Sequence, residues 1–193
     1  MEKPKSSDRA LKASREALKR PAVRAAIALG AVVVLVLVIV LISSSGGSSE
    51  SEPGAAEIVS IEALREAVAG GQTPVYWAGE QKGTELELSQ PGEGRTFVRY
   101  LNEGAEAGDP RPNFLTVGTY ALAHAVSTLR RQGRQPGGVI GSAPGHATVY
   151  FSKKDPHSVY LAYPGIEVEI EVYDPNFTRA LRLVDSGQIV AVG

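Results

Sequence analysis

Residues 25–42 read AAIALGAVVVLVLVIVLI, an unbroken run of eighteen apolar residues. An α-helix rises about 1.5 Å per residue, so this run spans roughly 27 Å, close to the ~30 Å hydrocarbon core of a bilayer. Val, Ile and Leu dominate the run, and their insertion into lipid is favourable. The sequence therefore predicts a transmembrane helix over residues 25–42, in contact with the lipid bilayer.

The charges on either side of the run predict its orientation. Residues 1–24 hold eight basic and three acidic side chains, whereas the rest of the chain holds 12 basic and 18 acidic ones. By the positive-inside rule, residues 1–24 form a basic cytoplasmic arm and the C-terminal part lies outside the cell membrane. A cleaved signal peptide that leaves a secreted domain is the alternative, because Ser43–Ser45 are small enough for a cleavage site. The length of the run favours an uncleaved signal anchor.

Residues 43–57, SSSGGSSESEPGAAE, are rich in Ser, Gly and Glu and lack apolar periodicity. This composition is typical of a flexible linker. Residues 58–193 are long enough for one extracytoplasmic domain. The chain has no cysteine, which excludes a disulfide framework, a thiolate zinc site and a cysteine nucleophile.

Three segments of this domain have a capping side chain before them and a glycine after them, as helices prefer. They are residues 61–69 after Ser60, residues 120–132 after Thr119 and residues 175–186 after Asp174, with Pro175 at the first helical position. Runs rich in β-branched and aromatic residues predict strands at 74–77, 84–89, 95–101, 114–118, 137–142, 146–151, 158–163, 166–173 and 189–192.

Short connections between these strands favour antiparallel pairing. The predicted fold class is α+β, an antiparallel sheet with about three helices packed on one face. VYWAGEQKGTELEL (75–88) also resembles VYLAYPGIEVEI (159–170), which suggests two related halves.

The strand IEVEIEVY places Glu167, Glu169 and Glu171 on one face. We expect this face to be solvated, either paired with Arg95 or Arg99 on a neighbouring strand or available to a basic partner surface. Carboxylates two residues apart are about 6.6–7 Å from one another, too far to share a calcium ion without ligands from loops. The three histidines are scattered, so no metal site is predicted.

Ser142, His146 and Asp174 are the residue types of a hydrolase triad, and they are the candidate catalytic residues. Their context, SAPGH, lacks the G-x-S-x-G elbow, so the sequence favours a domain that is not an enzyme. Trp77 and Tyr76 are candidate binding residues for a sugar ring or a peptide, although such aromatic side chains more often fill a core.

The acidic charge of the outer part of the chain and the lack of a phosphate-binding glycine loop exclude nucleic acid as a favoured partner, and no cofactor is implied. We therefore expect a membrane-anchored protein that displays a binding or interaction domain for a protein, cell-envelope material or a small molecule. The alternative is an extracytoplasmic serine-type hydrolase that uses Ser142 and His146. A third interpretation is a domain that only contributes to a membrane complex.

Overall fold

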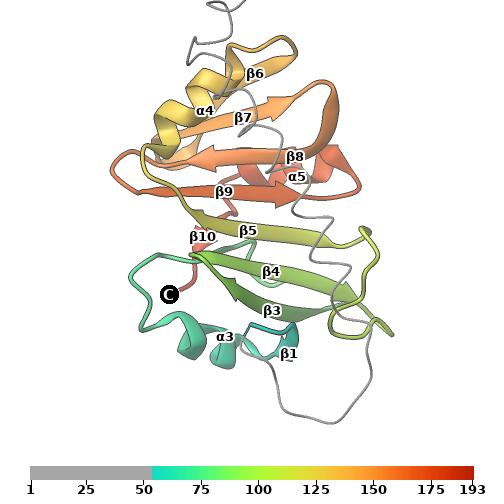
Figure 1. Cartoon of the computed structure of the whole chain (residues 1–193). Helices are drawn as coiled ribbons and strands as arrows, with labels where there is room; N and C mark the ends of the chain where they lie inside the picture. Colours follow the sequence, from blue (N-terminus) through green and yellow to red (C-terminus); the bar gives the residue numbers. More distant parts are fainter. Residues whose placement is uncertain (1–53) are drawn as a thin grey trace, which may run out of the picture. The chain divides into compact units, whose positions relative to one another are not determined.

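An eight-stranded antiparallel sheet organises residues 54–193, the part of the chain that this computed structural model describes (Figure 1). The strands lie in the order β1-β3-β4-β5-β9-β8-β7-β6, and a two-stranded sheet joins β10 to β2. The bounds are β1 (Glu57–Val59), β2 (Tyr76–Trp77), β3 (Thr84–Gly92), β4 (Arg95–Asn102), β5 (Leu115–Ala121), β6 (Gly138–Ala143), β7 (Ala147–Ser152), β8 (Asp155–Ala162), β9 (Val168–Tyr173) and β10 (Val190–Ala191). The large antiparallel sheet that the sequence predicts is confirmed.

Three α-helices accompany the strands in the described residues, which confirms the α+β class. They are α3 (Ile61–Val68), α4 (Ala125–Gly133) and α5 (Phe177–Asp185), and a 3₁₀ turn spans Pro144–His146. The predicted cytoplasmic arm (1–24), membrane helix (25–42) and all but the last four residues of the predicted linker lie outside the described residues. Within residues 54–193, none of the helices has the length and apolar character needed to cross a bilayer.

The helix starts agree only in part with the capping residues that the sequence predicts. Ser60 caps α3 as predicted, and its hydroxyl accepts a hydrogen bond from the Ala63 N–H at 3.1 Å. Thr119 does not cap a helix, because β5 continues to Ala121 and α4 begins only at Ala125. Asn176 caps α5 in place of Asp174 and accepts from the Thr178 N–H at 3.1 Å. The last two predicted helix starts are therefore wrong.

The helices cover both faces of the sheet, so the expectation of a single covered face is wrong. Leu64 of α3 and Leu183 of α5 lie in the main core with Ile170 of β9. Leu129 of α4 belongs to a second cluster with Ala162 of β8, on the opposite face. Side chains alternate along each strand, so both faces of β8 and β9 present residues that a helix can bury.

The suggested relation between two halves is not seen in the strand pairing. Residues 159–170 form the β8–β9 hairpin, in which Leu161 pairs with Ile170. In the other segment β2 pairs with β10 rather than with β3, and Val190 lies opposite Trp77. The Val192 N–H also donates to the Val75 carbonyl at 2.8 Å. The end of the chain is thus held beside β2, and β10 does not join the large sheet.

Candidate functional site

The aromatic side chains that the sequence singled out lie in the core. Trp77 is 8% and Tyr76 5% exposed. The Tyr76 ring stacks on Tyr163 with centroids 5.6 Å apart, and burial raises the pKa of the Tyr76 hydroxyl. The structure therefore places these rings as packing elements between the small sheet and the large one, and not on an open surface.

The glutamates of β9 are not a solvated face. Glu167 is exposed, but Glu169 and Glu171 are each 4% exposed, because α4 and the preceding segment cover this side of β9. Arg95 and Arg99 are not their partners among the described residues. The expectation that all three carboxylates face water is wrong for the last two.

Glu171 is surrounded by hydroxyl donors from two neighbouring strands. Its carboxylate accepts hydrogen bonds from Ser158 Oγ at 2.6 Å, Tyr120 Oη at 2.7 Å and Tyr160 Oη at 3.1 Å. Burial raises the pKa of the Tyr160 and Tyr120 hydroxyls, and the adjacent Glu171 raises it further. Both phenols therefore stay protonated and act as donors. These bonds satisfy the buried carboxyl group, which forms no ion pair within residues 54–193.

Glycine at position 118 gives Tyr120 the room to reach this carboxylate. Gly118 lies opposite Glu171 in the β5–β9 ladder. A Cβ atom at Gly118 would lie 3.0 Å from Tyr120 Cε2 and Oη, tighter than ordinary van der Waals contact. The ring of Tyr120 therefore lies over Gly118 and directs its hydroxyl along the sheet.

Glu169 lacks the hydrogen-bond donors that surround Glu171. Its buried Oε2 has no hydrogen-bond partner in the described residues. Burial, and then the charge of Glu171, raise the pKa of Glu169 to about 7. Within this cluster of two carboxyl groups and three hydroxyls, Glu169 is therefore the group whose protonation changes near neutral pH.

A buried ion pair joins two other strands of the sheet. Arg99 Nη1 is 2.7 Å from Glu87 Oε1, and the two residues are directly opposed on β4 and β3. Arg99 also donates to the Asp109 carbonyl at 2.7 Å, and Glu87 Oε2 accepts from the Gly108 N–H at 2.6 Å. The pair thus attaches the β4–β5 loop to the sheet. The sequence predicted that Arg95 or Arg99 pairs with a glutamate on a neighbouring strand, but it did not predict that the pair also holds the β4–β5 loop.

Ser142 and His146 lie in the β6–β7 hairpin. Ser142 is exposed and pairs with Thr148 in the ladder. His146 is exposed at the end of the 3₁₀ turn, with a left-handed φ of 61°. Neither side chain forms a hydrogen bond with the residues that the structure describes.

Asp174 lies at the other end of the same strands. Its N–H donates to the His157 carbonyl at 3.2 Å, near the start of β8, whereas the hairpin that carries His146 lies beside Ala162 at the end of β8. Five residues of a strand span about 16 Å. The structure therefore does not bring Ser142, His146 and Asp174 together, and Asp174 acts instead at the start of α5.

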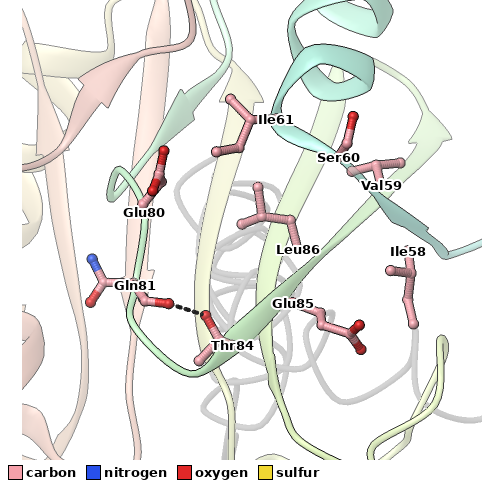
Figure 2. A pocket seen from close by; sticks show the side chains of 9 residues that line it. All are labelled: Ile58, Val59, Ser60, Ile61, Glu80, Gln81, Thr84, Glu85 and Leu86. Carbon is pink, nitrogen blue, oxygen red and sulfur yellow. Dashed lines mark hydrogen bonds between the residues drawn. The ribbon is translucent and has the colours of Figure 1, made fainter.

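A pocket of about 340 Å³ lies where β1 meets the start of β3, and we name it the β1 pocket (Figure 2). Its lining comes from β1, the start of α3, the β2–β3 loop and the start of β3. The lining residues are Ile58, Val59, Ser60, Ile61, Glu80, Gln81, Thr84, Glu85 and Leu86. Figure 2 shows Leu86 between the Glu80–Gln81 loop and the β1 side of the pocket.

The β1 pocket combines an apolar floor with an acidic rim. Ile58 is 47% exposed, which is uncommon for a large apolar side chain. Glu80 and Glu85 are exposed, and neither pairs with a cation in residues 54–193. The Thr84 hydroxyl donates to the Gln81 carbonyl at 2.8 Å, which closes the loop beneath Glu80. This site was not predicted from the sequence, because the three residues of β1 are too few to give a recognisable strand pattern.

Within the described residues, no group of three or more His, Asp and Glu side chains is arranged to hold a metal ion. Comparison with known proteins gives no match to a family model, to a curated protein or to a solved structure. A function for this domain is therefore inferred from the chemistry of its own surface and pockets.

Proposed function

We propose that this chain is a single-pass membrane-anchored protein with a cytoplasmic N-terminus, whose extracytoplasmic α+β domain binds a partner protein. The apolar run at residues 25–42 and the basic residues before it support the anchor and its orientation. We further propose that the β1 pocket receives a lysine or arginine side chain of that partner.

The observation that carries the binding site is the pairing of an apolar floor with two carboxylates that have no cation in the described residues. Lys and Arg have an apolar stem and a charged head, so one such side chain can contact Ile58 and Leu86 and reach Glu80 or Glu85. An aliphatic side chain would leave both carboxylates without a cationic partner, and the carboxylates would repel an acidic side chain.

The test uses the full chain in lipid nanodiscs and two fluorescent peptides, one of alternating Leu and Arg and one of alternating Leu and Glu. We expect the basic peptide to bind more tightly. Each exposed ion pair contributes about 0.2–1 kcal/mol, so Glu80→Gln with Glu85→Gln weakens its binding roughly 2- to 30-fold.

The matched control is Glu66→Gln with Glu103→Gln, which removes two exposed carboxylates outside the pocket lining. Binding of the basic peptide should persist in this control. Equal weakening in both double variants would mean that the peptide responds to net charge alone, and the β1 pocket would be rejected. No preference for the basic peptide would reject it as well.

A further inference from the structure

The basic residues of the described domain are unevenly placed. Residues 112–154 hold five Lys and Arg side chains and no Asp or Glu, whereas the other described residues hold seven basic and 16 acidic side chains. We name these five residues the α4 basic patch. They are Arg130, Arg131, Arg134, Lys153 and Lys154.

Backbone contacts bring the two parts of the patch together. The three arginines lie in the last turn of α4 and at its C-terminal cap. The Lys153 N–H donates to the Gly137 carbonyl at 2.8 Å, in the loop that follows α4. A Cβ atom at Gly137 would lie 3.1 Å from Lys154 Cγ, so the lysine stem runs across this loop. The β7–β8 turn and the end of α4 are therefore neighbours.

The whole patch is available to a partner. All five side chains belong to exposed residues, and none is paired with a carboxylate within residues 54–193. The apolar side of α4 is turned towards the sheet through Ala125 and Leu129, which leaves the arginines on its outer side. Unpaired cations on one surface indicate an anionic partner.

The patch lies far from the β1 pocket. Figure 1 shows α4, β6 and β7 at one edge of the large sheet, and α3 and β1 at the other. Seven strand spacings separate β6 from β1, which corresponds to about 34 Å at ~4.8 Å each. One edge of the domain is thus basic, and the other carries the acidic pocket.

We propose that the α4 basic patch docks on anionic phospholipid headgroups of the membrane that holds residues 25–42. This inference rests on the membrane anchor of the proposed function. The 15 residues at 43–57 enter the domain at β1 and can reach at most about 50 Å when extended, which is more than the ~34 Å between the β1 edge and the patch. Docking is then an intramolecular step, in which the attraction of the patch for the headgroups offsets the cost of extending the linker.

Docking in this way orients the domain. With the β6 edge against the headgroups, the β1 edge is held on the far side of the domain. The β1 pocket then opens away from the bilayer, where a second protein has access to it. The acidic edge, which anionic lipid repels, adds to the same orientation.

The experiment uses the full chain reconstituted in vesicles. Because the chain has no cysteine, a single introduced cysteine is a unique site for a fluorescent label. One fluorescent donor is attached at Gln135→Cys, beside the patch, and another at Ala67→Cys on α3; both positions are exposed. The acceptor is a headgroup-labelled lipid. The vesicles are phosphatidylcholine with or without phosphatidylglycerol.

We expect phosphatidylglycerol to increase energy transfer from position 135 but not from position 67. Added salt should reverse the increase, because screening weakens contacts between exposed charges. Each near-surface cation contributes a factor of about fivefold to membrane association. Arg130→Gln with Arg131→Gln and Lys154→Gln should therefore abolish the response to phosphatidylglycerol.

The matched control is Arg65→Gln with Lys82→Gln and Arg182→Gln, three exposed cations outside the patch. This variant should keep the response. Equal loss in both triple variants, or no response in the unsubstituted chain, overturns the docking proposal. A response to added poly(glycerol phosphate) and not to phosphatidylglycerol also overturns it, in favour of a soluble polyanion. Release of the chain from vesicles by alkaline carbonate would instead overturn the membrane anchor.

Discussion

Glu169 and Glu171 lie two residues apart on the same buried side of β9, yet only Glu171 is surrounded by hydrogen-bond donors. Three hydroxyl groups donate hydrogen bonds to the side chain of Glu171. Burial, and then the neighbouring Glu171, disfavour the charged form of Glu169. Two identical side chains thus have different hydrogen-bond environments because of their neighbours.

The first prediction concerns the pH dependence of stability. The pKa of Glu169 rises from its ordinary 4.5 to about 7 through burial and the charge of Glu171. The folded state therefore keeps a proton that the unfolded state releases near pH 4.5. The stabilisation is complete below pH 4.5 and is lost as the pH rises to 7, in total roughly 3 kcal/mol.

Glu169→Gln should remove this slope, because an amide does not titrate, and should make the protein more stable than the unsubstituted chain above pH 7. Urea denaturation across this pH range measures both effects. The exposed Glu167→Gln variant is the control and should keep the slope. An unchanged slope in Glu169→Gln would assign the titration to another group.

The second prediction concerns the donors around Glu171. Tyr120→Phe removes a 2.7 Å hydrogen bond to a buried charge and should lower the free energy of unfolding by about 2 kcal/mol. Tyr150→Phe is the control, because the Tyr150 hydroxyl does not bond to Glu171 among the described residues. Thermal or urea unfolding measures the loss of stability in each variant. Similar losses of free energy of unfolding in the two variants would mean that the effect does not come from the hydrogen bond to Glu171.

The third prediction concerns the ion pair between β3 and β4. Arg99→Met leaves Glu87, which is 1% exposed, buried without its partner. Breaking such a pair costs about 3–5 kcal/mol, whereas replacing both partners costs less. Arg99→Met with Glu87→Gln should therefore be more stable than Arg99→Met alone in urea denaturation.

The same substitution should loosen the loop that the pair holds. Cleavage after Glu106, which is exposed in that loop, by a glutamate-specific endoprotease should become faster in Arg99→Met. Cleavage by the same protease after the exposed Glu66 of α3 serves as the internal reference. If both sites become faster by the same factor, global unfolding and not release of the loop is responsible.

The fourth prediction concerns the proposed orientation in the membrane. Lys12→Cys and Gln135→Cys each give a unique thiol in a chain without cysteine. In intact cells, a membrane-impermeant maleimide should label position 135 and leave position 12 unlabelled until the cells are opened. The reverse pattern would contradict the orientation. Recovery of a labelled protein that lacks position 12 would support cleavage and secretion.

The long strands could be predicted from the sequence because their signals are local. Alternation of apolar and polar residues and flanking glycines located β3, β4, β8 and β9 to within a few residues. Ser60 was likewise identified as a cap, because the cap and the helix it starts are contiguous. Such patterns depend on neighbours within a few positions.

The errors arose where a distant segment decides the outcome. Thr119 resembles a helix cap, yet its hydroxyl accepts a hydrogen bond from the Tyr76 N–H at 3.0 Å, 43 residues away, and it stays in β5. Glu171 resembles a surface residue, yet the hydroxyls of Tyr120 and Ser158 make its burial favourable. These partners come from other strands, and no local pattern contains them.

The pairing of β10 with β2 has a consequence for how the domain is made. β10 completes a sheet whose other strand lies more than a hundred residues earlier. β2 therefore stays without its partner until residues 190–191 have been made and can reach it. If the chain crosses the membrane as proposed, this pairing forms only after residues 190–191 have been exported, and its long range makes that step intrinsically slow.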